Sequence, residues 1–218
     1  PLIVYLPLRE EPWTADRAHG FFANLLPEGR AREAICRSLG VSVENDVVLL
    51  RALGDETAGA FRFVAPDHDG GEGRERRIIS HRELEDWAEG APAFSTDPEH
   101  PPRLSLAGAQ HKTSVVKTPG GYAVPAHGEP STHILKFDSP DFPHLAANEF
   151  LTTRFAENLG LAVVDSRLDA QTSPPLLVVE RYDRRIEGET VRRLHQEDFC
   201  QFLGYLPSQK YESDGGPG

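Results

Sequence analysis

The first third of the chain carries its apolar residues mainly at helical spacing. Helices are predicted over residues 21–26, 28–39 and 45–53. Gly40 and Gly54 directly follow the last two segments, where glycine commonly ends a helix. Ser42 or Asn45 is suited to cap the third helix through a side-chain oxygen.

Two segments of the same region favour strands. Residues 2–6 form a continuous apolar run, and residues 59–64 alternate apolar with polar positions. Further along, Ser80 is suited to cap a helix that contains Leu84 and Trp87. The first hundred residues are therefore predicted to mix short helices with a few strands.

From residue 104 onward, strands dominate the pattern. They are predicted over residues 104–107, 113–116, 122–124, 133–137, 163–168, 176–180 and 190–194. One long helix is predicted over residues 144–159, where Ala147, Leu151, Phe155 and Leu159 recur every four positions. A short helix follows over residues 196–203. Several strands around one long helix predict an α+β fold with a mainly antiparallel sheet.

A break in this pattern divides the chain. Residues 90–102 contain four prolines and few apolar residues, which is typical of a boundary between two structural units. We therefore predict one unit over residues 1–98 and a second over residues 99–218. Residues 66–77, rich in Asp, Gly, Glu and Arg, are predicted as a solvated loop.

Composition narrows the class of protein. The 218 residues include 39% hydrophobic and 26% charged residues, as in ordinary globular domains. The formal net charge of −11 argues against broad binding of nucleic acid. The two cysteines are far apart and no long apolar run or signal peptide is present, so a cytoplasmic location is expected. No methionine occurs and the last residues resemble a loop, so we expect a truncated sequence.

The segment Ser105-Leu-Ala-Gly-Ala-Gln-His-Lys112 lies between two predicted strands. Its small residues at 107–109 would let the backbone approach a ligand closely, and successive N–H groups in such a turn can hold an anion. Lys112 would add a positive charge at its edge. A tight hairpin without a ligand explains the same composition.

Lys136 interrupts an apolar strand and is the second candidate for chemistry. It either faces water or pairs with nucleotide phosphates, as the strand lysine of protein kinases does. Such a lysine needs an acidic partner, and Glu149 lies on the next predicted helix. Residues 178–185 begin apolar and become charged; they represent either a strand leaving the core or a kinase hinge.

Other catalytic classes lack their motifs. The nine histidines show no metal-ligand spacing, and no serine lies in a GxSxG turn. Asp141-Phe142-Pro143 is not a metal-binding DFG motif, because it precedes the hinge candidate and has proline in place of glycine.

Taken together, these strings resemble HipA-type serine/threonine kinases, the toxins of bacterial HipBA toxin–antitoxin pairs. The matching strings follow the family order over residues 22–29, 45–53, 59–60, 105–112, 132–136, 148–149, 179–184, 194–200 and 210–217. The resemblance implies that residues 1–98 are the HipA N-terminal subdomain. It implies that residues 99–218 are a kinase-like, ATP-binding N-lobe, truncated before the helical C-lobe.

The resemblance also implies site residues. ATP would contact Ala107, Gly108, Ala109, Gln110, His111, Lys112, Lys136, Glu180, Arg181 and Tyr182, with Glu149 as the candidate ion-pair partner of Lys136. Ser105 matches the autophosphorylated serine of the family, where a phosphate adds a charge of about −1.5 to −2. In the family this phosphorylated segment leaves the site and ATP binding is lost. His111 replaces a glutamate often seen in the loop.

One part of the family pattern is missing. No Asp-Gly-His-x-Lys-Asn motif occurs, so the catalytic aspartate and the Mg²⁺ ligands would lie beyond Gly218. Because phosphoryl transfer depends on those groups, this chain alone is expected to be inactive.

The implied partners are a HipB-like antitoxin, an aminoacyl-tRNA synthetase as the phosphorylated substrate, and operator DNA contacted mainly through the antitoxin. The implied cellular effect is stalled translation and persistence, without any membrane role. Two other interpretations remain: a non-catalytic regulatory lobe that pairs with a separate kinase half or with the antitoxin, and an unrelated α+β protein.

Overall fold

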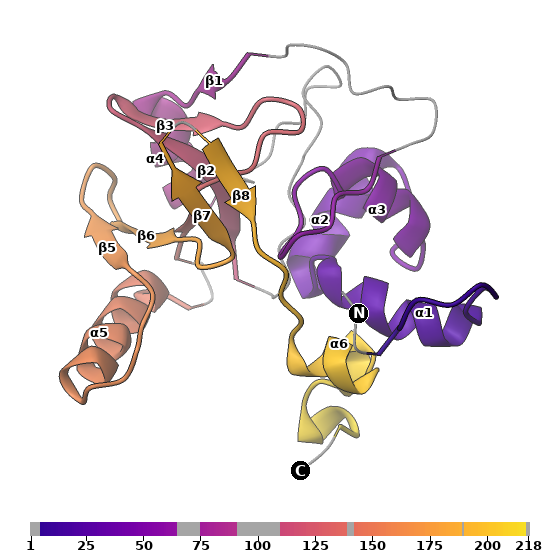
Figure 1. The fold of residues 1–218 in the computed structure, drawn as a ribbon. Helices are drawn as coiled ribbons and strands as arrows, with labels where there is room; N and C mark the ends of the chain where they lie inside the picture. Colours follow the sequence, from indigo (N-terminus) through magenta and orange to yellow (C-terminus); the bar gives the residue numbers. More distant parts are fainter. Residues whose placement is uncertain (1–4, 65–74, 91–109, 139–141, 189, 217–218) are drawn as a thin grey trace.

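A computed structural model of the chain describes residues 5–64, 75–90, 110–138, 142–188 and 190–216. Helices from the first quarter of the chain lie on one side of the molecule, and a twisted antiparallel sheet lies on the other (Figure 1). The predicted α+β class, mainly antiparallel, is confirmed by the strand pairing.

The N-terminal side is built from short helices whose ends follow the sequence signals. These are α1 (Ala15–Phe22), the 3-10 helix η1 (Ala23–Leu25), α2 (Gly29–Leu39) and α3 (Asp46–Leu53). Asn45 caps α3 by accepting a hydrogen bond from the Val48 N–H at 3.1 Å. Gly40 ends α2 at a φ of +65°, which glycine adopts without strain. Leu26, Ile35, Cys36, Leu49 and Leu53 form the core between the helices.

The strand predicted over residues 59–64 is wrong for its described backbone, which forms a turn and an irregular segment. The alternation is real, but the partner is a helix and not another strand. Phe61 packs edge-on against Phe21, and Phe63 packs edge-on against Phe22, each with ring centroids 5.7 Å apart. The predicted strand over residues 2–6 lies largely outside the described residues.

The sheet has the strand order β1-β3-β2-β4-β6-β5 and every pairing is antiparallel. Its strands are β1 (Arg77–Ile78), β2 (Lys112–Thr118), β3 (Gly121–Val124), β4 (His133–Lys136), β5 (Ser166–Asp169) and β6 (Leu176–Glu180). A separate hairpin joins β7 (Arg184–Glu187) to β8 (Thr190–Arg193). The predicted strand over residues 104–107 lies outside the described residues.

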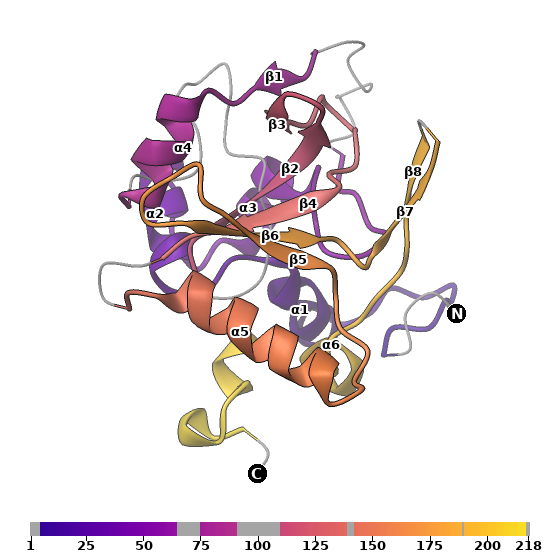
Figure 2. The ribbon, with the colours of Figure 1, turned by 90° about the vertical axis from the view of Figure 1, so that its left-hand side faces the viewer.

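One helix packs on each face of the sheet (Figure 2). On one face, α4 (His81–Ala88) contributes Leu84 and Trp87 to a core with Val115, Leu135 and Val178. On the other face, α5 (Leu145–Asn158) packs through Ala146 against Leu177 and Val179. Although β1 and α4 precede the predicted boundary at residue 98, they pack on the sheet formed after it. The boundary itself falls among residues 91–109, which the structure does not describe.

The apolar stripe that the sequence showed on α5 does not face the sheet. Leu151, Phe155 and Leu159 are 64%, 65% and 65% exposed, whereas Ala146 is buried. The helix therefore presents a different side to the sheet, and this side also carries Glu149 toward β4.

The C-terminal segment packs against the N-terminal helices. Helix α6 (Phe199–Leu203) packs beside α1, where the Gln201 side chain donates to the Phe21 carbonyl at 3.3 Å. Asn24 donates to the Tyr205 carbonyl at 2.7 Å. Two 3-10 turns follow, η2 (Pro207–Gln209) and η3 (Glu212–Asp214). In the part of the chain that the structure describes, no helix is both long and apolar enough to cross a membrane.

Candidate functional site

Two lysines on neighbouring strands define the candidate site. Lys112 begins β2 and Lys136 ends β4, and the register places them directly opposite each other. Directly opposite residues in an antiparallel pair project from the same face. Leu177, which pairs with Lys136, belongs to the cluster beneath α5, so both lysines lie on the α5 face of the sheet.

Helix α5 supplies the acidic partner. The Lys136 Nζ lies 2.5 Å from the Glu149 Oε1, and both side chains are only partly exposed. This is the contact between a strand lysine and a helix carboxylate that the sequence indicated as one alternative. Because Glu149 neutralises one of two neighbouring ammonium groups, the pair leaves a local excess of positive charge.

Burial and like charge act on Lys112. Burial, and then the nearby charge of Lys136, lower the Lys112 pKa to about 8, although Glu28 and Glu149 oppose the shift. The C-terminal segment adds a third lysine to these surroundings. The Lys210 Nζ donates to the Glu28 Oε1 at 3.0 Å, and this bond outweighs burial and raises the Lys210 pKa. Three lysines facing two glutamates suit an anion, within a chain whose net charge is −11.

The last residues of the predicted phosphate loop are anchored at the end of β4. The His111 carbonyl accepts from the Phe137 N–H at 3.0 Å, and its ring lies 5.0 Å from the Phe137 ring. Burial lowers the His111 pKa to about 4, so the ring is neutral at pH 7. The Gln110 amide donates to the Phe137 carbonyl at 3.4 Å. Ser105 and residues 107–109 lie outside the described residues.

The predicted hinge forms a tight turn after β6. The Glu180 N–H donates to the Asp165 carbonyl and the Arg181 N–H donates to the Thr132 carbonyl, at 2.9 and 3.0 Å. Tyr182 follows with its side chain 68% exposed. Glu180 pairs with His133, three positions along β4 from Lys136, which separates the turn from the lysines by roughly 10 Å. The lysines and the turn thus occupy two ends of one strand pair.

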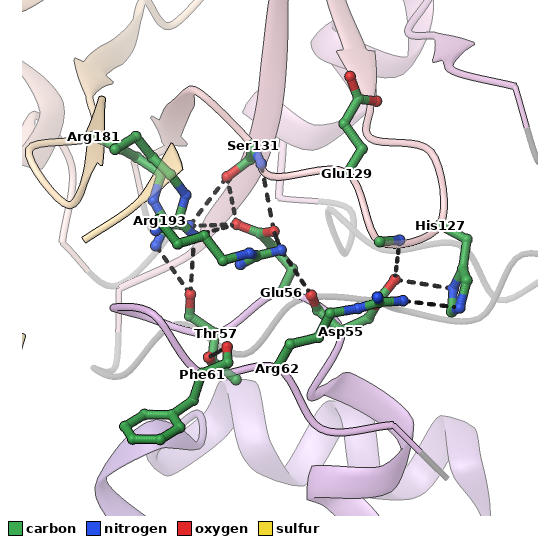
Figure 3. Close-up of polar contacts among 12 residues, drawn as sticks. Asp55, Glu56, Thr57, Phe61, Arg62, His127, Glu129, Ser131, Arg181 and Arg193 are labelled. Atoms are coloured by element: carbon green, nitrogen blue, oxygen red, sulfur yellow. Dashed lines mark hydrogen bonds and ion pairs between the residues drawn. The ribbon is translucent and has the colours of Figure 1, made fainter. Parts of the chain in front are cut away.

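The Arg181 side chain points away from this turn into a buried group of charges (Figure 3). We call this group the Glu56 cluster, and its members are Glu56, Ser131, Arg181, Asp183, Arg184 and Arg193. The sequence left open whether residues 178–185 leave the core, and it did not indicate that Arg181 and Arg184 are buried. The available signal was weak: the acidic pair Asp55-Glu56 beside Gly59.

The residues of the candidate site fit a nucleotide better than a metal ion. Two facing ammonium groups fit the phosphates of a nucleotide, and the exposed Tyr182 ring fits a flat base. Over residues 5–64, 75–90, 110–138, 142–188 and 190–216, no three His, Cys, Asp or Glu side chains gather to hold a metal ion.

Comparison with known proteins places the chain in a family. A family model described as the HipA N-terminal domain matches residues 1–64, and one described as the HipA-like C-terminal domain matches residues 104–217. The serine/threonine-protein kinase toxin HipA of Shewanella oneidensis is 36% identical over 220 residues, which cover all of this chain and 50% of that protein. The protein Y4mE of Sinorhizobium fredii is 39% identical over 224 residues, which cover all of this chain and 53% of that protein.

A solved structure gives the same result. HipA of Shewanella oneidensis, in a complex with HipB and its operator DNA, matches with a TM-score of 0.80 and 36% identity. The match covers 100% of this chain and 51% of that chain, so this chain spans about half the length of the relatives it matches. Two family models and a structural match that covers all of this chain agree, and the chain belongs to the HipA family.

Proposed function

We propose that this chain is the nucleotide-binding half of a HipA-type serine/threonine protein kinase that takes ATP as phosphoryl donor. The observation that carries the proposal is the placement of Lys112 opposite Lys136, with Glu149 bonded to the latter. Two ammonium groups and one carboxylate leave a positive end for the phosphates. Glu180, Arg181 and Tyr182 lie at the other end, where backbone groups and the Tyr182 ring would hold the adenine.

Each residue has a separate part in binding. Glu149 keeps the Lys136 ammonium on the α5 face and aimed at the phosphates. Lys112 gains charge stabilisation when an anion arrives, because its pKa is depressed in the free protein. ATP supplies the γ-phosphoryl group, which passes to a serine hydroxyl with cleavage of the bond to ADP. In HipA-type kinases the aspartate that takes the hydroxyl proton, and the ligands of Mg²⁺, belong to a helical lobe whose Asp-Gly-His-x-Lys-Asn motif does not occur in this sequence.

This chain would hold the phosphate-binding residues but not the catalytic base or the metal ligands, which determines what it can do by itself. With a phosphate site but without the base and the metal ligands, it is expected to bind ATP and not to turn it over. Ser105 is the proposed autophosphorylation site. Its phosphate would add about −1.5 to −2 charge, and we propose that the phosphorylated segment then leaves the site and that ATP binding is lost.

The cellular role follows from the family. We propose a cytoplasmic toxin that phosphorylates an aminoacyl-tRNA synthetase and is restrained by a HipB-like antitoxin, with operator DNA contacted mainly through the antitoxin. The solved complex of the Shewanella oneidensis HipA with HipB and operator DNA supports the antitoxin partner. The alternative is a regulatory lobe that binds a separate kinase half.

The experiment is ATP binding to the full chain by isothermal titration calorimetry, with Lys112→Met and Lys136→Met as the test variants. Lys117→Met is the matched control, because Lys117 lies on the same strand β2 but is exposed and projects from the opposite face. Binding that is weaker but still measurable in both test variants, with Lys117→Met unchanged, is the expected result. Equal binding by all four proteins, or no binding by the unsubstituted chain, would contradict the proposal.

A further inference from the structure

The turn at Glu180–Tyr182 is held from inside by one arginine. The Arg181 side chain is 1% exposed, and all five N–H groups of its guanidinium meet an acceptor. The acceptors are both carboxylate oxygens of Asp183 at 2.8 and 2.6 Å, the Glu56 Oε1 at 2.8 Å, and the Ser131 Oγ and the Thr57 carbonyl, each at 3.1 Å. A fully bonded, planar group of this kind fixes the backbone that carries it.

Glu56 is the centre of the cluster. Its Oε1 accepts from Arg181 and Arg184, each at 2.8 Å, and from the Ser131 hydroxyl at 2.7 Å. Its Oε2 accepts from Arg193 at 2.9 Å. One carboxylate, 5% exposed, therefore contacts three guanidinium groups that are 1%, 0% and 11% exposed. Figure 3 shows Arg181, Ser131 and Arg193 converging on it.

The segment that carries Glu56 also bonds to the far side of the turn. The Gly59 N–H donates to the Asp183 Oδ2 at 2.7 Å, and the Gly59 carbonyl accepts from the Arg184 guanidinium at 3.0 Å. Residues on both sides of Tyr182 are thus tied to residues 56–59, which lie more than a hundred positions earlier in the sequence. Tyr182 itself remains exposed between these anchored neighbours.

The charge balance makes Glu56 decisive. Three arginines face only two carboxylates, Glu56 and Asp183, inside a region that excludes water. Without the Glu56 charge, Asp183 would be the one carboxylate of the cluster beside three guanidinium groups. These groups would then repel one another in surroundings that hold little water. The turn would then move until those groups reached water, and Tyr182 would move with it.

We infer that Glu56 is a positioning residue for the adenine end of the nucleotide site. It acts through Arg181 and Arg184, and so it makes the N-terminal part of the chain a support for the hinge. This inference rests on the proposed function, because it concerns the orientation of the turn that would receive the adenine. None of the hydrogen bonds that Glu56 makes within the cluster involves Lys112 or Lys136, the residues of the phosphate end.

The test compares two ligands, Mg-ATP and inorganic tripolyphosphate, which share phosphates but not the base. Their dissociation constants are measured by calorimetry for the full chain, for Glu56→Gln and for Asp55→Asn. Asp55→Asn is the matched control, since this neighbouring carboxylate bonds instead to Arg62, the Gly128 N–H and His127. Circular dichroism establishes that each variant is folded.

We expect Glu56→Gln to weaken ATP about tenfold while tripolyphosphate binds as before, and Asp55→Asn to change neither. An equal loss for both ligands would show a merely structural role and overturn the inference, as would unchanged ATP affinity. Failure of the unsubstituted chain to bind ATP would instead refute the proposed function, and this inference with it. If Glu56→Gln does not fold, Ser131→Ala removes one bond to Glu56 and one to Arg181 without removing charge. The same selective loss for ATP, smaller in size, is then expected, and its absence overturns the inference.

Discussion

The depressed pKa of Lys112 makes a quantitative prediction about ATP binding. Burial and the charge of Lys136 lower this pKa to about 8 in the free protein. In the proposed site a bound triphosphate would favour the protonated ammonium, so we expect ATP to bind the charged form of Lys112 and to raise its pKa. Raising the pH through 8 removes that proton from the free protein before ATP arrives. The affinity for ATP must therefore fall as the pH rises, and proton uptake must accompany binding near pH 8.

The size of the change in ATP affinity follows from the fraction of Lys112 side chains that is protonated at each pH. About nine-tenths of the Lys112 side chains are protonated at pH 7 and about one-tenth at pH 9, which predicts a loss of affinity of about tenfold between the two. Calorimetry in buffers of different ionisation enthalpy measures both the affinity and the number of protons taken up. The Lys112→Met variant provides the baseline, because it retains every other ionisation, including that of ATP. An unsubstituted chain that follows the pH profile of Lys112→Met would refute this account.

Three further predictions concern the stability of the fold. Glu56→Ala leaves the buried Arg181 and Arg184 and the partly buried Arg193 short of a partner, and it should cost about 3–5 kcal/mol, or roughly 6–20 °C in Tm by calorimetry. Glu187→Ala, which removes only the exposed pair with Arg192, should change Tm little. Gly20→Ala places a Cβ 2.8 Å from the Gly204 carbonyl oxygen, where α1 contacts α6, and should lower the free energy of unfolding in urea by about 1–3 kcal/mol. In the control Gly120→Ala the new Cβ meets no atom within 4 Å, and an equal loss of stability there would contradict the explanation. Tyr122→Phe removes the hydroxyl that donates to the buried Asp169 at 2.6 Å and should cost about 1–3 kcal/mol, and an unchanged urea midpoint would show that this bond contributes nothing.

Much of the architecture could be predicted because local signals agree with the final packing. Strand β6 is an apolar run, and β2 and β4 each hold two adjacent apolar residues at their centres. Helix α3 begins after the capping Asn45, and α4 begins after Ser80 with a complete capping box. Helix α5 was predicted, but its apolar stripe is exposed in this structure, since periodicity does not say which side of a helix meets the sheet. The strand predicted from the alternation over residues 59–64 was wrong for a related reason: a half-buried segment can pack against a helix as well as pair with a strand.

The candidate site divides in the same way. Lys136 could be identified in the sequence because a charged residue within an apolar strand is conspicuous. Glu149 could be identified because a phosphate-binding lysine needs an acidic partner and Glu149 lies on the next predicted helix. The burial of Arg181 and Arg184 was not visible, since it depends on Glu56, which lies 125 and 128 residues away in the sequence. Long-range ion pairs of this kind leave no periodic signal, and only the assembled fold shows which charges are paired.

The most direct test of the account uses an acyl-phosphate derivative of ATP, which transfers its acyl group to lysines beside the phosphates and is then located by mass spectrometry. We expect modification of Lys112 and Lys136 that excess ATP abolishes, and no effect of ATP on the modification of Lys117, which lies on the opposite face. Modification that excess ATP does not suppress, or that falls on Lys117 in place of the facing pair, would contradict it.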